Sequence, residues 1–195
     1  HLEGDDPYDK FLPKISSVVS KIIIVYFCLT LVLFFLYYLN GMTLFDSIAH
    51  SFTTISTGGF STHNNSFAYF ENTTILNIAI VFMILGSFPF LVLAQSSFKN
   101  IPLIAKDHQI RLFLIILIFA ISLIYFFAKE YVAGDIFFKI STISFNTISI
   151  ISGTGYVSEN FENWGNYASV LFLILMFIGG CAGSTTGGLK VFRFQ

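Results

Sequence analysis

Charge and cysteine are scarce in this chain, and each scarcity excludes a class of protein. Charged residues occupy 11% of the 195 positions, about half the share found in an ordinary soluble domain. The two cysteines, Cys28 and Cys181, lie far apart inside apolar runs, so we expect small core residues rather than a disulfide framework or a zinc site. The net charge of −1 excludes a basic nucleic-acid surface, and no nucleic-acid partner is expected.

Signatures of enzyme chemistry are also missing. The sequence has no G-x-S-x-G nucleophile elbow and no H-E-x-x-H helix, so we expect no enzyme and no bound cofactor. Lys190 does not complete a phosphate loop, because leucine precedes it and no Ser or Thr follows it. His50 and His63 flank a glycine-rich stretch without other ligands at metal spacing, and we interpret both as polar loop residues.

Apolar residues are abundant instead, at 55% of the chain, with 25 phenylalanines among them. Crossing about 30 Å of hydrocarbon requires roughly 20 apolar residues in a helix. Four segments meet this length, and the last is interrupted by glycines: residues 15–39, 73–95, 110–128 and 167–192. The composition therefore predicts an all-α membrane protein with several spans.

The polar segments divide the chain into two similar halves. Residues 1–14 are interpreted as a cytoplasmic N-terminal segment, or as the remnant of a tag or truncation, and the last residues as the interior of a continuing segment. Residues 15–95 and 110–195 are predicted to form two units, joined by a cytoplasmic linker at 96–109. Each unit contains a span, a half-span, a glycine loop and a second span.

An internal duplication explains this order. "STGGFS", beginning at Ser56, matches "GTGYVS", beginning at Gly153, with an offset of 97 residues. This register places Thr57-Gly58 against Thr154-Gly155. A second register aligns "FTTIS" with "FNTIS" and separates the glycines, so we use the glycine register for function.

The half-spans carry helix start signals and are too short to cross a membrane. Thr43 followed by Asp46 fits a capping box, and Asp135 can cap the second half-span. We therefore expect two re-entrant pore helices of about 14 residues each. Basic residues set the orientation: of the 10 Lys and Arg residues, all but Lys129 and Lys139 fall on one side, which predicts cytoplasmic termini.

The glycine loops then enter the membrane from the outside. Non-helical backbone at membrane depth must be buried in protein or line an aqueous cavity. A ring of backbone carbonyls can replace the hydration shell of potassium, as in the filter sequence TVGYG. The alternative for Gly58, Gly59 and Gly155 is a tight turn or close helix packing. Their occurrence in equivalent places of a duplicated unit favours the filter.

Three stretches resemble the Trk/Ktr/HKT family of potassium transporters: "TISTGGFSTHNNSFAYF" from Thr54, "ISGTGYVSENFENW" from Ile151 and "IGGCAGSTTGGLKVFR" from Ile178. The resemblance implies four membrane-pore-membrane repeats around one pore, of which this chain resembles the second and third. It places filter backbone, and bound potassium, at Ser56, Thr57, Gly58, Gly59, Thr154, Gly155 and Tyr156. Val157 departs from the pattern, since relatives often have glycine there.

The last span carries five glycines in residues 179–188, and this number removes helix propensity. Broken membrane helices accompany ion pathways, although a small-residue helix-packing seam is the alternative. The resemblance implies an intramembrane gating loop at 179–190, with the gate at Gly183, Ser184, Thr185, Thr186, Gly187 and Gly188. Whether Lys190 contacts the cavity or extends to the interface is left open.

The functional hypothesis is potassium uptake through a carbonyl filter gated by the glycine loop. The alternative is a secondary transporter that binds a small substrate at broken helices by alternating access. The resemblance further implies a bacterial inner membrane protein, a homodimer and a TrkA-type nucleotide-binding regulatory subunit in the cytoplasm.

Overall fold

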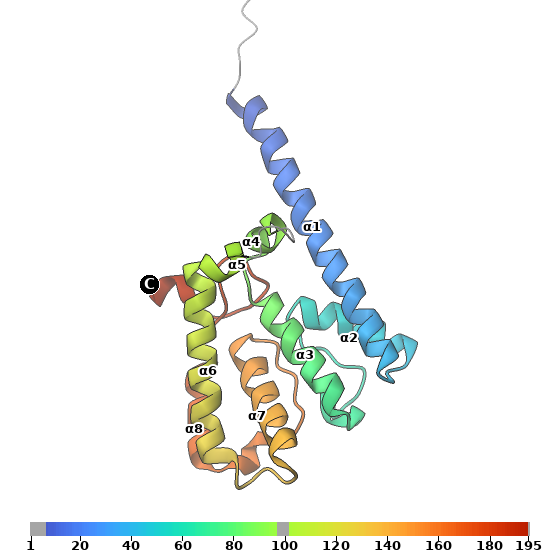
Figure 1. Cartoon of the computed structure of the whole chain (residues 1–195), viewed down its shortest axis with the longest axis vertical. Coiled ribbons are helices and arrows are strands. Elements are labelled where there is room, and N and C mark those ends of the chain that lie inside the picture. The colour runs from blue at the N-terminus through green and yellow to red at the C-terminus, as the bar shows by residue number, and fades with distance from the viewer. Residues whose placement is uncertain (1–6, 97–101, 195) are drawn as a thin grey trace, which may run out of the picture.

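The computed structural model describes residues 7–96 and 102–194. Within these ranges the named elements are all helices, and the chain ends in a short 3-10 turn (Figure 1). The predicted N-terminal segment 1–14 and linker 96–109, with Lys99, fall partly or wholly outside the described residues. The helices are α1 (Pro7–Leu39), α2 (Leu44–Ile55), η1 (Ser66–Phe70), α3 (Thr73–Gly86), α4 (Phe90–Gln95), α5 (Pro102–Lys106), α6 (His108–Ala128), α7 (Ile136–Ile151), η2 (Phe161–Trp164), α8 (Asn166–Leu175) and η3 (Val191–Phe194).

Helices α1 and α6 are long and apolar enough to cross a membrane. They confirm helix at the predicted spans 15–39 and 110–128. Asp107 caps α6, because its Oδ1 accepts hydrogen bonds from the backbone N–H groups of Gln109 at 2.9 Å and Ile110 at 3.1 Å. Ile23 of α1 and Phe119 of α6 are more than half exposed. Such apolar faces suit a lipid environment.

The predicted span 73–95 is wrong as a continuous helix. Helix α3 ends at Gly86, and the short α4 begins at Phe90. Pro89 has no N–H to continue a helical ladder and disfavours helix at the residue before it. The freed carbonyls find distant partners: the N–H of Thr185 donates to Gly86 at 3.2 Å, and that of Cys181 donates to Ser87 at 3.0 Å.

The fourth predicted span is broken, as expected, but the break begins before the first glycine. Helix α8 ends at Leu175, and the following residues form a folded loop. This loop closes on itself, because the N–H of Gly179 donates to Leu189 at 2.8 Å, and that of Leu189 donates to Phe177 at 3.0 Å. The polar backbone of the interruption is thus paired internally, as burial requires.

The two half-spans form helices α2 and α7, of 12 and 16 residues. Thr43 Oγ1 accepts from the Asp46 N–H at 3.1 Å, and Asp135 Oδ1 accepts from the Phe138 N–H at 3.2 Å. Both predicted caps are confirmed. At 1.5 Å per residue these helices measure about 18 and 24 Å, which is less than the hydrocarbon thickness.

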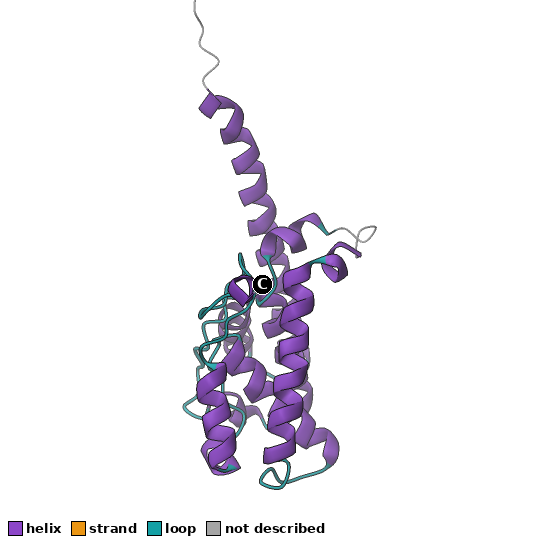
Figure 2. Cartoon of the chain, turned by 90° about the vertical axis from the view of Figure 1, so that its left-hand side faces the viewer, coloured by secondary structure: helices purple, strands orange, loops and turns teal. Residues whose placement is uncertain are grey.

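The helices pack so that α7 lies against both α3 and α6, and α1 lies against α2, α3 and α4. Seen from the side, α1 extends beyond the rest of the molecule (Figure 2). Cys181 is buried in the core, as predicted, whereas Cys28 is exposed on α1. The core prediction for Cys28 is therefore wrong, because the apolar run that contains it presents an outer face.

Candidate functional site

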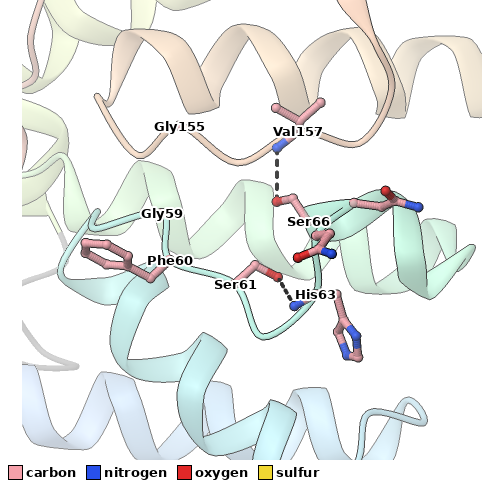
Figure 3. Close-up of a pocket in the computed structure, with 9 residues that line it drawn as sticks. Gly59, Phe60, Ser61, His63, Ser66, Gly155 and Val157 are labelled. Atoms are coloured by element: carbon pink, nitrogen blue, oxygen red, sulfur yellow. Dashed lines mark hydrogen bonds between the residues drawn. The ribbon is translucent and has the colours of Figure 1, made fainter.

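The two glycine loops lie side by side at the ends of α2 and α7 (Figure 3). The loops begin at the C-caps Ser56 and Ser152. The Thr154 carbonyl oxygen is so close to Gly59 that a Cβ on Gly59 would overlap it. An open cavity of about 480 Å³ lies beside this contact, lined by both loops and by the segment that follows the first.

The backbone angles of the two loops correct the register of the duplication. In the first loop the positive φ angles fall at Thr57 (49°) and Gly59 (69°), and in the second at Gly153 (70°) and Gly155 (84°). These pairs are 96 residues apart, so the predicted offset of 97 is wrong by one residue. Thr57-Gly58 therefore does not match Thr154-Gly155.

Side-chain hydrogen bonds support the same register. Thr53 Oγ1 of α2 donates to the Phe60 carbonyl at 2.9 Å, and Ser149 Oγ of α7 donates to the Tyr156 carbonyl at 2.7 Å. Sequence reasoning missed Gly153, which occupies the place of Thr57. Counting from the ends of the two pore helices, rather than aligning glycines, is the signal that finds it.

The predicted filter glycines differ in what their positions require. Gly59 and Gly155 adopt the left-handed conformation that favours glycine. Gly58 has no such constraint, and the nearest atom to a Cβ there is the Ser56 hydroxyl at 3.1 Å. A Cβ on Gly155 would meet nothing within 4 Å, so only its backbone angle demands glycine.

Tyr156 joins the second glycine loop to helix α2. Its side chain is buried, and its hydroxyl lies 2.5 Å from Thr53 Oγ1 and 3.2 Å from Thr54 Oγ1. Tyr37 of α1 extends this network, with its hydroxyl 3.1 Å from Thr54 Oγ1. The side chain of Tyr156 therefore anchors the second loop to α2. Only the backbone of Tyr156 remains a candidate for ion contact.

We expect Tyr156→Phe to destabilise the protein by about 1 to 3 kcal/mol, because buried hydroxyl partners lose a hydrogen bond. Exposed Tyr38 is the matched position, and Tyr38→Phe should change stability by less than about 0.5 kcal/mol. Thermal unfolding in detergent measures both. Equal stability of the two variants would contradict a role of the hydroxyl in holding the loop.

Helices α2 and α7 each also hold the later residues of the loop that follows them. His50 Nε2 lies 2.9 Å from Ser61 Oγ, and the Asn146 side-chain amide donates to Ser158 Oγ at 2.8 Å. His50 is fully buried within α2, so its interpretation as a loop residue is wrong. The helical spacing of four from Asp46, whose carbonyl lies 2.8 Å from His50 Nδ1, was the overlooked signal.

His63 does lie in a loop, as predicted. Its ring stacks on Tyr69 with centroids 3.6 Å apart, and its Nε2 lies 3.2 Å from Asp46 Oδ1. Across the described part of the chain, no cluster of three or more His, Cys, Asp or Glu residues is placed to hold a metal ion. His50 and His63 each lie against a polar neighbour, Ser61 and Asp46 respectively.

The glycine-rich loop at residues 179–190 reaches the carboxyl ends of helices α2 and α7. Thr185 Oγ1 donates toward the carbonyls of Ile55 and Gly86, each at 3.0 Å. The Thr57 hydroxyl lies 3.3 Å from the hydroxyl oxygen of Thr185. A Cβ placed on Gly153 would lie 3.5 Å from the Gly187 nitrogen. The loop thus lies next to equivalent residues of the two glycine loops, Thr57 and Gly153.

The remaining predicted gate residues shape the same loop. Gly183 and Gly188 have positive φ angles of 75° and 73°, and the Gly183 carbonyl accepts from the Phe90 N–H at 3.0 Å. Ser184 Oγ lies 2.7 Å from Thr186 Oγ1. All six predicted gate residues therefore belong to one folded unit.

Lys190 takes neither of the simple alternatives left open by the sequence. Its ammonium does not extend away from the loop but folds back onto it, donating to the carbonyl and hydroxyl of Thr186 and toward the hydroxyl of Ser184. The side chain is half-buried. Lys190 is therefore an integral part of the folded loop at residues 179–190.

Comparisons with known proteins agree with this architecture. The family model TrkH, described as a cation transport protein, matches residues 3–195. The potassium uptake protein TrkI of Halomonas elongata is 34% identical over all of this chain and 40% of its own length. The potassium uptake protein TrkH of Escherichia coli K12 is 32% identical over 95% of this chain and 39% of its own.

A solved structure extends the likeness to three dimensions. The potassium transporter TrkH from Vibrio parahaemolyticus superposes with a TM-score of 0.87 and 33% identity, over 93% of this chain and 40% of that one. The chain thus spans about 40% of the length of these relatives. They are membrane transporters rather than enzymes. The chain belongs to the TrkH family of cation transport proteins.

Proposed function

We propose that this chain supplies two walls of a potassium uptake pore, in which the glycine loops act as selectivity filter. The ion contacts are assigned to the backbone of Thr57, Gly58 and Gly59 and of the equivalent Gly153, Thr154 and Gly155, with the predicted Ser56 and Tyr156 flanking these two stretches. The named function of the matched relatives, potassium uptake, supports this proposal. Potassium is the cargo, and no resident cofactor is proposed.

The observation that carries the proposal is the meeting of the two loops at the carboxyl ends of two capped helices. A helix carries about half a negative charge at its carboxyl end, which favours a cation near Ser56 and Ser152. Positive φ angles at equivalent positions of both loops require unusual backbone, which persists only where the surroundings hold it. A selectivity filter gives such backbone a function.

The glycine loop at residues 179–190 is proposed as the gate of this pore. Its support is the hydrogen bond between the hydroxyls of Thr57 and Thr185 and the position of Gly187 beside Gly153, where a Cβ on Gly153 would lie 3.5 Å from the Gly187 nitrogen. A structure that blocks passage must also be able to move. The small residues of this loop give it alternative backbone conformations.

The cellular setting is proposed from the relatives. They are named as proteins of a Trk system, which supports a partner subunit, here proposed as a TrkA-type nucleotide-binding protein on the cytoplasmic side. We also propose a homodimer in a bacterial plasma membrane, with both ends of this chain in the cytoplasm.

A growth experiment tests the proposed function. The protein is expressed at its full encoded length in a bacterium that lacks its own potassium uptake systems. We expect growth at low external potassium together with rubidium uptake. Uptake no higher than with an empty vector, despite protein in the membrane, would overturn the proposal.

Glu159 gives a prediction for the outer mouth. It lies two residues beyond Val157, and burial raises the pKa of its carboxyl above the ordinary value of 4.5. As the external pH falls, Glu159 becomes neutral earlier than an exposed carboxylate, so its attraction for cations is lost first.

We expect the Glu159→Gln variant to lose the part of the pH dependence of rubidium uptake that lies above the range in which exposed carboxylates titrate, because burial raises the pKa of Glu159. Glu162→Gln, at an exposed position in the same segment, is the control and should retain that part. The uptake rate is measured across external pH. Identical pH profiles for Glu159→Gln and wild type would contradict a role for this carboxylate.

A further inference from the structure

The ammonium of Lys190 sits among neutral oxygens. Thr186 offers its carbonyl and, at 3.0 Å, its hydroxyl, and Ser184 offers its hydroxyl at 3.4 Å. The ion pairs of the described part of the chain do not include Lys190. Among the described residues, the atoms that the Lys190 ammonium contacts are therefore neutral oxygens.

Such an arrangement suits a second kind of cation. A primary ammonium and a potassium ion carry the same single charge, and both bind carbonyl and hydroxyl oxygens. Lys190 differs because it is tethered to the chain. Its ammonium can hold the loop in one conformation but cannot travel through a pore.

The oxygens around Lys190 are also held by other parts of the loop. Thr186 Oγ1 accepts from the Gly180 N–H at 3.0 Å, and Ser184 Oγ donates to the Cys181 carbonyl at 2.6 Å. These bonds do not involve Lys190. The oxygen cluster should therefore keep its shape when the ammonium is removed.

We propose that these three oxygens form a monovalent-cation site in the gate loop, and that the Lys190 ammonium occupies this site and keeps the loop closed. When Lys190 leaves, potassium takes its place among the oxygens of Ser184 and Thr186. The inference rests on the proposed function of this loop as a gate.

The test compares wild type with Lys190→Met, which keeps a long unbranched side chain and removes the charge. Lys129→Met, at a lysine whose side chain is 43% exposed, is the matched control. We expect basal rubidium uptake to rise about tenfold in Lys190→Met, a modest shift of a two-state equilibrium. We also expect rubidium to raise the Tm of purified Lys190→Met in detergent more than that of wild type.

A second substitution assigns this binding to the loop. Adding Ser184→Ala to Lys190→Met should reduce the extra rise in Tm produced by rubidium, because one oxygen is lost. If the rise is unaffected, the site is not formed by these oxygens. If Lys190→Met does not fold, Ser184→Ala alone should give a smaller increase in basal uptake, and unchanged uptake overturns the proposal.

The outcomes separate this inference from the proposed function. Potassium-selective uptake by wild type, with uptake and Tm response unchanged in Lys190→Met, would refute the cation site and leave the pore in place. Absence of potassium or rubidium uptake in wild type and in every variant, despite protein in the membrane, would refute the pore itself.

Discussion

Replacing Gly59 with alanine is expected to abolish selective potassium uptake, whereas Gly58→Ala is expected to retain most of it. Gly59 has a φ of 69°, and a Cβ there would overlap the Thr154 carbonyl oxygen of the neighbouring loop. The left-handed conformation alone costs roughly 1 to 2 kcal/mol with a Cβ, and the overlap forces the two loops apart. One methyl group therefore disturbs both of the loops that are proposed as filter walls.

Gly58 is the matched control, because it is adjacent, carries the same substitution and has an ordinary φ. A Cβ there would lie 3.1 Å from the Ser56 hydroxyl, a group that can rotate away. The ratio of potassium to sodium uptake should fall at least about tenfold in Gly59→Ala, equivalent to 1.4 kcal/mol of lost discrimination. Equal losses in both variants would contradict the assignment of the constrained position to Gly59.

The second large effect is expected for Thr185→Val, which keeps side-chain shape and removes the hydroxyl that reaches Ile55 and Gly86. The Gly86 carbonyl retains the Thr185 N–H at 3.2 Å, but the Ile55 carbonyl loses this partner. Losing such a bond costs about 1 to 3 kcal/mol. The conformation with the loop against α2 is then less favoured.

Basal rubidium uptake should therefore rise about tenfold in Thr185→Val, since each 1.4 kcal/mol changes an equilibrium tenfold. Thr74→Val, at an exposed position of α3, is the control and should leave uptake unchanged. Uptake in vesicles without the proposed regulatory subunit is the measurement. A decrease, or no change, in Thr185→Val would contradict the role of this hydroxyl in closing the gate.

Much of the fold follows from length, apolar runs and capping residues. Four long spans and two capped half-spans were predicted; the structure contains two of the spans as long helices, α1 and α6, and both half-spans, α2 and α7. The break between Gly86 and Phe90 was missed, because apolar residues continue across it and only Pro89 and the glycine loop interrupt the helix. The carbonyls exposed there are paired by residues almost 100 positions away, as in the bond from Thr185 to Gly86. The periodicity of apolar residues in one sequence does not reveal contacts between residues so far apart in the chain.

The sequence predicted which two loops form the candidate site, but it aligned the two loops with each other one residue out of register. Aligning glycine with glycine paired Gly58 with Gly155, although the structure pairs Gly59 with Gly155 and Thr57 with Gly153. Thr57 adopts a positive φ that threonine rarely takes, so residue type alone gave no signal there. Whether these residues bind potassium remains a prediction.

The most direct test of the central claim is the ratio of potassium to sodium flux in vesicles containing the full encoded protein or its Gly155→Ala variant. Gly155 has a φ of 84° with nothing within 4 Å of a Cβ, so alanine strains the filter backbone without a steric overlap. The account predicts potassium-selective flux in the wild type and loss of selectivity in the variant. Selectivity untouched by the substitution would mean that the glycine loops are packing turns.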